Sequence, residues 1–437
     1  GVSKLIGIGP HISGQSELFK DIEKQFFQNT KAFLNQYKHS WFKDETILIK
    51  GARMFGFEKI SEALQQKAHE TVMEINLNSI TDNLNYFRSK LQPETKVMAM
   101  VKAFSYGSGS FEIANILQFH RVDYLAVAYA DEGMELREAG ITVPILVLNP
   151  QEKSYNTIID YYLEPEIYSF RLLESFAEAL KRNDKTGSDS QYPVHLKLDT
   201  GMHRLGFELA DINELILRIK NYQKFKIVSV FSHLAASEDP AHDDFTNQQI
   251  DLFKQMSNTI AGHFNYPIMR HILNSAGIVR FPEAHFEMVR LGIGMYGIST
   301  AKELNKKLKT VTSLKSSISQ IKTVEANESV GYARAGASDI PRQIATIGIG
   351  YADGLDRRLG NGVGHLMVNG KKATLVGNVC MDMCMIDITG INVKEGDEVE
   401  IFGDAQSLNE IAEKLDTISY EVLSSIPPRV KRIYFQE

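Results

Sequence analysis

A repeated alternation of strand and helix patterns fills the middle of this chain, from about residue 70 to residue 300. Amphipathic segments such as 79–91 and 248–264 separate short apolar runs with the length of strands. Those runs are residues 72–77, 96–101, 124–128, 145–148, 194–198, 227–231 and 272–273. An α/β fold of the (β/α)8 TIM barrel type has this rhythm and a usual size of about 250 residues. A doubly wound sheet is the rival, but no G-x-G-x-x-G motif follows an early strand.

The two flanks of the predicted barrel have different textures. Residues 1–68 are typical of a small βαβα fragment, with strands at 4–9 and 46–51 and helices at 17–37 and 57–69. After the barrel, which we place at 69–303, short strands and turns indicate a mostly β domain over 304–437. Its expected elements are strands at 313–324, 343–349, 365–368, 373–379, 398–402 and 430–435, a hairpin turn at Asn369-Gly370 and a helix over 407–423.

Composition and charge exclude several classes of protein. The net charge of −6 argues against a basic nucleic-acid-binding surface. No apolar run approaches the ~20 residues of a membrane span, and no charged-then-apolar leader opens the chain. The two cysteines, Cys380 and Cys384, indicate a reducing cytoplasm, and the sequence offers no further metal ligands near them. We therefore expect a cytoplasmic protein with no metal, nucleic-acid or membrane partner.

Lys102 directly follows the strand-like run 96–101, and Tyr106 and a loop that contains Gly107 and Gly109 come after it. Buried lysines are rare unless they are paired or reactive. A desolvated amine has a lowered pKa and becomes a nucleophile, which is the state required for a Schiff base with pyridoxal 5'-phosphate. The alternative is a strand end whose lysine extends into solvent.

Polar residues also close consecutive strands of the predicted barrel, in the segments 197–206, 232–234, 274–277 and 289–297. Active sites of such barrels lie at the carboxyl ends of the strands. Ser275 and the small residues after it could donate hydroxyl and backbone N–H groups to a phosphate. Taken alone, His233 could be a hydrogen-bonded core histidine and Arg290 a structural ion-pair partner. Four such segments together favour a site.

At these motifs the chain resembles the alanine racemase family, which are fold-type III enzymes that use pyridoxal 5'-phosphate. The resemblance spans about residues 70–434. Nine ordered motifs carry it, at residues 101–109, 197–206, 231–235, 274–276, 290–297, 331–333, 350–354, 377–382 and 420–422. It implies a two-base interconversion of L-alanine and D-alanine that supplies D-alanine for peptidoglycan.

The resemblance implies catalytic roles for two residues. Lys102 would hold the cofactor and act as the base on one face of the substrate, and Tyr332 of the partner subunit would be the base on the opposite face. A phenol near pKa 10 is a poor base at neutral pH, so positive charge supplied through His233 and Arg290 would stabilise the phenolate. Arg290 would face the pyridine nitrogen and leave it unprotonated, because arginine does not give up its proton. A homodimer with shared active sites follows.

The same resemblance implies a set of binding residues. The cofactor would be held by Lys102, Tyr106, His233, Asn274, Ser275, Arg290, Gly292, Ile293 and Tyr420. Arg204, the backbone at Met381 and Tyr351 would bind the substrate, alanine. Lys197 matches a position that is often carbamylated in this family, which would give Arg204 an anionic partner. The chain departs from the family pattern at Phe104, Ser108, His203 and Asn378 without losing a proposed catalytic group.

Residues 1–68 resemble the end of a Mur ligase, the enzyme type that adds D-alanyl-D-alanine to the muramoyl tripeptide. Residues 47–53 and Glu58 carry this resemblance. A nucleotide-binding glycine-rich loop with a lysine is absent from the sequence, so we expect no ligase chemistry from this chain. Because only the end of a ligase's last domain is present, we expect a truncated ligase–racemase fusion, which would place D-alanine production beside its consumption. The start at Gly1 rather than methionine also indicates a processed or cut chain.

Other functions and another assembly stay open at this point. The chain could racemise another small amino acid such as serine, or act as a fold-type III decarboxylase, although the short segment around Met381 favours a small substrate. A non-catalytic pyridoxal-phosphate-binding barrel is disfavoured, because such carriers lack the second β domain and with it Tyr332. The alternative to the homodimer is a monomer whose β domain folds back onto its own barrel.

Overall fold

The structure of the protein is a computed structural model that describes residues 2–38, 41–42, 47–51, 55–64, 71–183 and 191–436. The chain divides into two compact units, residues 1–70 and 71–437. Each unit has a hydrophobic core of its own. Within the described residues, no helix has the length and apolar character needed to cross a membrane.

The first unit contains a two-stranded parallel sheet, in which β1 (Lys4–Ile8) and β2 (Glu23–Phe27) pair along their whole length. Phe27, Phe33 and Ile60 form its buried core. Its helices are α1 (Pro10–Ser13), the 3₁₀ helix η1 (Ser16–Leu18), α2 (Thr30–Gln36) and α3 (Glu58–Leu64).

The sequence predicts this unit only in part. The strand expected at 4–9 is confirmed as β1, but the single helix expected over 17–37 is wrong, because that stretch contains β2 before α2. Pairing of β2 with β1 buries Phe27, and this tertiary gain overrides the helical pattern. Residues 47–51 of the expected strand 46–51 are irregular, and residue 46 lies outside the described residues. The helix expected at 57–69 is present as α3, with residues 65–69 outside the described residues.

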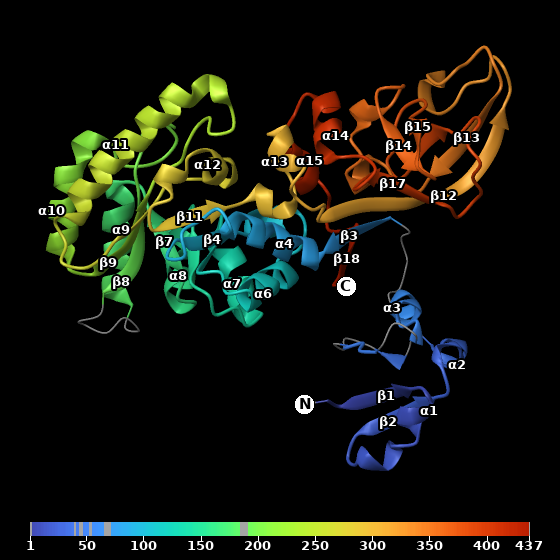
Figure 1. The fold of residues 1–437 in the computed structure, drawn as a ribbon, viewed down its shortest axis with the longest axis horizontal. Helices are drawn as coiled ribbons and strands as arrows, with labels where there is room; N and C mark the ends of the chain where they lie inside the picture. The colour runs from blue at the N-terminus through green and yellow to red at the C-terminus, as the bar shows by residue number, and fades with distance from the viewer. Residues whose placement is uncertain are drawn as a thin grey trace. The chain divides into compact units, whose positions relative to one another are not determined.

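Eight parallel strands form a nearly closed barrel in the second unit (Figure 1), as the strand–helix alternation predicts. Their order is β10-β9-β8-β7-β6-β5-β4-β11. The backbone N–H of Arg290 in β11 donates a 3.1 Å hydrogen bond to the carbonyl oxygen of Leu273, just after β10, and so brings the two ends of the sheet together. The strands are β4 (Lys96–Met100), β5 (Tyr124–Val127), β6 (Ile145–Val147), β7 (Glu164–Ile167), β8 (Tyr192–Lys197), β9 (Phe225–Phe231), β10 (Met269–His271) and β11 (Met288–Leu291).

Amphipathic helices lie around the barrel strands (Figure 1). In α9 the buried side chains recur at helical spacing, and the Ser169 side chain accepts a hydrogen bond from the Leu172 N–H to cap the helix. The helices of this part are α4 (Leu77–Arg88), α6 (Phe111–Phe119), α7 (Ala130–Glu138), α8 (Tyr155–Asp160), α9 (Phe170–Arg182), α10 (Ile212–Tyr222), α11 (Asp243–Ala261), α12 (Ser275–Arg280) and α13 (Lys302–Asn305).

The β domain is built on the long strand β12 (Thr312–Val324), which the sequence predicts to within one residue. The sheet runs β15-β14-β17-β12-β13-β16. The hairpin turn at Asn369-Gly370 joins β14 to β15, and both residues have positive φ, as a two-residue turn of this kind requires. The further strands and helices are β13 (Arg342–Ile347), β14 (His365–Val368), β15 (Lys371–Thr374), β16 (Cys384–Asp387), β17 (Glu398–Phe402), α14 (Leu408–Leu415), α15 (Ser419–Ser424) and β18 (Lys431–Phe435).

Several expected elements differ from the structure. The run 72–77 forms β3 (Val72–Asn76), which pairs with β12 and β18 instead of joining the barrel. Its apolar alternation indicates a strand but carries no information on which sheet receives it. The helix expected over 407–423 is divided into α14 and α15, because Asp416 adopts a left-handed conformation between them. β15 ends at Thr374, earlier than the expected strand 373–379.

Candidate active site

Lys102 begins a turn of left-handed backbone, separated from the end of β4 by the single residue Val101. The four residues Ala103–Tyr106 have φ values from 50° to 55°, a conformation that is strained for residues other than glycine. The Glu132 carboxylate holds this turn in place. One of its oxygens accepts a 2.6 Å hydrogen bond from the Ala103 N–H, and the other accepts one of 2.7 Å from the Ala128 N–H at the end of β5.

The C-terminal strand β18 fixes the other end of this lysine turn. Arg432 donates from Nε to the Gly107 carbonyl oxygen at 3.0 Å and from Nη2 to the Ile426 carbonyl oxygen at 2.6 Å. A Cβ added at Gly109, whose φ is +101°, would lie 1.6 Å from the Tyr434 hydroxyl oxygen, so only glycine fits there. Contacts from both the barrel and the β domain therefore fix the position of Lys102.

The environment of Lys102 favours the neutral amine. Burial, followed by the positive charge of Arg204, lowers the pKa of Lys102, and Arg290 acts in the same direction. Glu132 opposes this change without reversing it. A lysine at the end of a barrel strand with a lowered pKa is suited to attack a carbonyl group and to accept a proton.

Arg290 lies buried in β11 at the centre of a group of hydrogen bonds. Its Nη2 donates to the Ser232 carbonyl oxygen at 2.7 Å and to His233 Nδ1 at 3.1 Å, and its Nη1 lies 2.9 Å from His271 Nδ1. Burial and the neighbouring cations hold the pKa of both histidines well below the usual value. Burial lowers the pKa of Arg290 to about 10, which still leaves the guanidinium charged at neutral pH.

Ser275, Gly292 and Gly294 form a small polar cluster next to Tyr106 of the lysine turn. The Ser275 hydroxyl oxygen accepts hydrogen bonds from the Gly292 and Gly294 N–H groups at 3.0 and 3.2 Å, which leaves its own proton available to a ligand. The Tyr106 ring packs 4.9 Å from Tyr296 and 5.8 Å from Tyr420 between ring centroids.

Two further residues of the expected cofactor set adjoin Ser275 and Gly292 in the chain. Ile293 is buried and opens the 3₁₀ helix η8 (Ile293–Tyr296). Asn274 caps α12 through Oδ1, which accepts a hydrogen bond from the Gly277 N–H at 2.9 Å, so its side chain has a structural task.

The loop after β8 carries the residues expected to bind a substrate carboxylate. Asp199 organises it by accepting hydrogen bonds from the Gly201 N–H at 2.9 Å and the His203 N–H at 3.0 Å. Arg204 is exposed beyond this turn, whereas Lys197 is buried at the end of β8. The Lys197 Nζ atom lies 4.5 Å from the centroid of the Phe231 ring.

Tyr332, Tyr351 and Met381 lie in the β domain, and the structure does not bring them to Lys102. Their exposed fractions are 72%, 44% and 54%, with Met383 beside them at 46%. The Asn378 side chain donates a 3.1 Å hydrogen bond to the Tyr332 carbonyl oxygen. No hydrogen bond or ring contact among the described residues joins Tyr332 to the barrel, so one chain alone does not complete the expected set.

Sequence reasoning overlooks the polar interior of the barrel. His195, His271, Glu164 and Glu166 are inward-facing residues of the strands, and three of them have side chains that are almost fully buried. The sequence feature that could identify these residues is a charged or imidazole side chain that interrupts an apolar strand run, as in Glu164-Pro165-Glu166. That same interruption is why β7 is missed as a strand.

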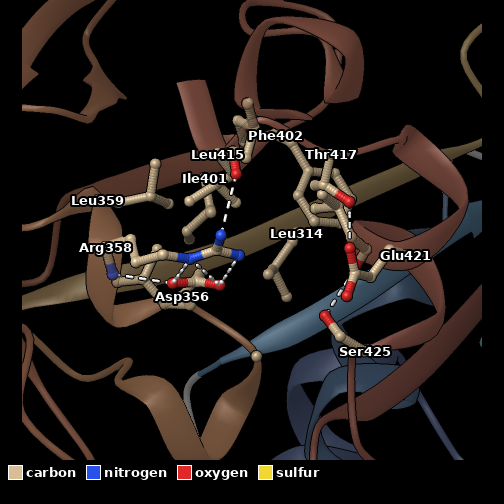
Figure 2. Close-up of a pocket in the computed structure, with 14 residues that line it drawn as sticks. Leu314, Asp356, Arg358, Leu359, Ile401, Phe402, Leu415, Thr417, Glu421 and Ser425 are labelled. Carbon is tan, nitrogen blue, oxygen red and sulfur yellow. Dashed lines mark hydrogen bonds and ion pairs between the residues drawn. The ribbon is translucent and has the colours of Figure 1, made fainter. Parts of the chain in front are cut away.

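A separate pocket of about 80 Å³ lies in the β domain between β12, β17, α14 and α15 (Figure 2). Its charged groups are paired with protein atoms. Arg358 donates to Asp356 at 2.8 Å and to the Leu415 carbonyl oxygen at 2.9 Å, and Thr417 donates to Glu421. Because this pocket is small and its charged groups already have protein partners, it is a weaker candidate for the active site than the region around Lys102.

The barrel, its strand-end lysine and the adjacent polar cluster around Ser275 are typical of the class of barrel enzymes that carry pyridoxal 5'-phosphate on a lysine. Family models agree: residues 75–300 match "Alanine racemase, N-terminal domain" and residues 311–434 match "Alanine racemase, C-terminal domain". The chain belongs to the alanine racemase family.

Individual relatives support this membership. The chain is 36% identical over 379 residues to an alanine racemase of Methanococcus maripaludis, covering 84% of this chain and 99% of the relative. Among solved structures, an alanine racemase of Clostridium difficile 630 superposes with a TM-score of 0.78 at 33% identity, covering 85% of this chain and 97% of the other. An alanine racemase of Bartonella henselae with covalently bound pyridoxal phosphate gives 0.75 at 29% identity, covering 84% and 100%.

Proposed function

We propose that this protein interconverts L-alanine and D-alanine, with pyridoxal 5'-phosphate attached to Lys102. The observation that carries the proposal is the strained turn that presents Lys102, with a lowered pKa, beside Arg290 and its bound histidine His233. Alanine racemases that cover almost all of the second unit support the choice of reaction.

The residues around Lys102 fit this cofactor. Ser275 has a free hydroxyl proton for a phosphate oxygen, and Gly292 leaves room beside Tyr106, because a Cβ there would lie 3.1 Å from the Tyr106 hydroxyl oxygen. We infer that Ile293 and Tyr420 complete the phosphate site, with Asn274 holding the loop that carries Ser275. When bound, the cofactor withdraws electrons from the substrate Cα and makes its proton acidic.

Arg290 is the proposed partner of the pyridine nitrogen. Its guanidinium stays charged at neutral pH, so it donates a hydrogen bond to that nitrogen without transferring the proton, and the nitrogen stays unprotonated. An unprotonated ring withdraws electrons less strongly, which disfavours side reactions such as transamination.

Two bases on opposite faces of the substrate perform the proton exchange in this proposal. Lys102 Nζ accepts or returns the Cα proton on one face, helped by its lowered pKa. On the other face acts Tyr332 of the partner subunit. His233 accepts from Arg290 at Nδ1 and therefore carries its proton on Nε2, from which it can stabilise a phenolate.

We propose a homodimer with shared sites for the same reason. Tyr332, Tyr351, Met381 and Met383 together expose an apolar and aromatic edge of the β domain, and such patches are typical of interaction surfaces. Arg204 and the backbone at Met381 would hold the substrate carboxylate, with Tyr351 lining the same space. The short chain segment around Met381 favours a small substrate such as alanine.

Isotope exchange tests the proposed reaction directly. In deuterated water, the protein with pyridoxal 5'-phosphate should exchange the α-proton of either alanine enantiomer and produce the other. Lys102→Ala should abolish both the exchange and the borohydride-sensitive absorbance of the bound cofactor. A parallel panel that includes serine defines the substrate. Protein that binds the cofactor at Lys102 yet exchanges no α-proton would contradict the proposal.

The remaining proposals concern context. The two free cysteines, one of them buried, suit a reducing cytoplasm, where D-alanine is consumed in peptidoglycan synthesis. We further propose that residues 1–68 are the end of a ligase domain, followed by the cofactor-binding barrel at 69–303 and the β domain at 304–437. The family models cover only the two later parts.

A further inference from the structure

Glu166 is a buried carboxylate that the proposed reaction does not use. It lies in β7 and is 2% exposed. Acidic side chains are almost never fully buried unless opposite charges accompany them, because burial removes their hydration. The residues that surround Glu166 should therefore show what it does.

Strand geometry places Glu166 near Lys197 inside the barrel. Side chains of Glu164 in β7 and His195 in β8 meet there, with 2.8 Å between Glu164 Oε2 and His195 Nε2. Alternate residues of a strand share one face. Glu166 lies two residues beyond Glu164, and Lys197 lies two residues beyond His195. Both side chains therefore face the barrel interior, one layer closer to the carboxyl ends of the strands. Lys197 is 7% exposed.

Three cations act on the Glu166 carboxylate. Burial raises the pKa of Glu166 to about 7, and the charges of Lys197, Arg290 and Arg204 oppose that rise. Lys197 and Arg290 also approach the same aromatic ring, at 4.5 Å and 5.2 Å from the Phe231 centroid. Asp199 acts on Lys197 as well, but its carboxylate already accepts two backbone hydrogen bonds in its own loop.

We propose that Glu166 is a built-in counter-anion of the active site, which balances Lys197 and Arg204 and supplies the negative charge that a carbamate on Lys197 would otherwise bring. The proposal rests on the proposed role of Arg204 in holding the substrate carboxylate. Glu166 acts through these two cations, so it is a positioning residue. Lys197 consequently stays a free amine in this chain.

The chemistry of carbamate formation explains why Glu166 prevents it. The neutral Lys197 amine would attack the carbon of CO2, an N–C bond would form, one C=O π pair would move to oxygen, and the amine proton would pass to solvent. Burial lowers the pKa of Lys197 to about 8, and Glu166 opposes that fall, so less of the amine is neutral than it would be without this carboxylate. It would also repel the anion that forms. Without Glu166, the cations Arg290 and Arg204 would instead favour the carbamate.

The first test needs no variant and no activity assay. The unaltered protein with its cofactor is equilibrated with ¹³C-bicarbonate and examined by carbon NMR. We expect no carbamate resonance, and a stoichiometric carbamate signal would overturn the proposal. Because this readout does not depend on turnover, it separates this proposal from the proposed racemase activity.

The second test compares two carboxylates on the same face of β7. Glu166→Gln should show the carbamate resonance. In CO2-depleted buffer its kcat/KM for alanine should fall about tenfold or more, mainly through a higher KM. Adding bicarbonate should restore part of this loss. Glu164→Gln loses a carboxylate that contacts His195 instead, and it should show neither carbamate nor recovery. Adding Lys197→Met to Glu166→Gln should remove the recovery. Unchanged kcat/KM in Glu166→Gln, with no response to bicarbonate, would overturn the proposal.

Discussion

The Nη1 atom of Arg290 lies 2.9 Å from Nδ1 of His271, and both residues are buried inside the barrel. Arginine only donates hydrogen bonds, so His271 accepts at Nδ1 and carries its proton on Nε2. That proton is directed at the Ser229 hydroxyl oxygen, 2.8 Å away. Arg290 thereby fixes the tautomer of a histidine on a neighbouring strand.

The same reasoning continues to the far side of the barrel interior. Ser229 Oγ lies 2.6 Å from His195 Nδ1, and His195 Nε2 lies 2.8 Å from Glu164 Oε2. When ionised, a carboxylate only accepts, so His195 donates at Nε2 and accepts from Ser229 at Nδ1. Every hydrogen bond then runs from Arg290 toward Glu164, and each one polarises the next. This chain orients the guanidinium on which the proposed site depends.

His271→Ala should weaken both the fold and the reaction. It removes one of two buried partners from Arg290 Nη1, which keeps the backbone carbonyl oxygen of residue 271, and one of two from the Ser229 hydroxyl, which keeps His195. The loss of these two hydrogen bonds should cost about 1–3 kcal/mol of unfolding free energy. Loss of orientation at Arg290 should also lower kcat for alanine. Denaturant unfolding and racemase kinetics measure the two effects. His285→Ala is the matched control, because His285 is also buried but bonds only the Ile278 carbonyl oxygen, and its kcat should not change.

Acid should destabilise the protein through these histidines. The pKa values of His233 and His271 lie well below the usual 6.5 in the folded state, so the unfolded chain binds protons there first as the pH falls. Stability that is fully present above pH 6.5 is lost below it, by up to about 1.4 kcal/mol per pH unit for each histidine. His271→Gln, which does not titrate, should give a shallower decline in unfolding free energy between pH 6.5 and 5. An identical slope in both proteins would rule out His271 as a source.

Mixed dimers test whether two chains build each site. Lys102→Ala and Tyr332→Phe should each be inactive in the alanine exchange assay. After subunit exchange, a hybrid dimer has one site that contains both altered residues and one that contains neither, so a fraction of the activity should return. Size-exclusion chromatography of differently tagged chains confirms the exchange. Complete inactivity of verified hybrids would favour a monomeric site.

The sequence predicts an element of the fold where a periodic pattern of apolar residues marks its buried face. Periodic apolar runs identify the barrel and strands such as β14 and β17, because burial of one face dictates the pattern. β7 is missed because its interior side chains are Glu164 and Glu166, and β3 is recognised but placed in the wrong sheet. The partners of β3, which are β12 and β18, lie far from it in the chain, and a local sequence pattern does not indicate which distant strands will pair.

Only some residues of the candidate site can be proposed from the sequence. Residues at or near strand ends, such as Lys102, Ser275 and Arg290, can be proposed from the sequence, because barrel topology brings the carboxyl ends of the strands together. His195 and His271 are not found, since their role depends on contacts across strands that only coordinates show. The same holds for Arg432, whose sequence position near the end of the chain gives no sign of its contact with Gly107.

Arg432 should control how firmly the cofactor is held. It hydrogen-bonds the Gly107 carbonyl oxygen and three carbonyl oxygens of its own segment, and its guanidinium lies 5.7 Å from the Phe104 ring centroid. Arg432→Lys lacks the planar set of donors, so the strained lysine turn should relax and the affinity for pyridoxal 5'-phosphate should fall about tenfold, about 1.4 kcal/mol. Fluorescence titration measures it. Arg429→Lys, on the same segment but paired with Asp353 and Asp382, should retain the affinity. Equal losses in both variants would show a general weakening of the segment instead.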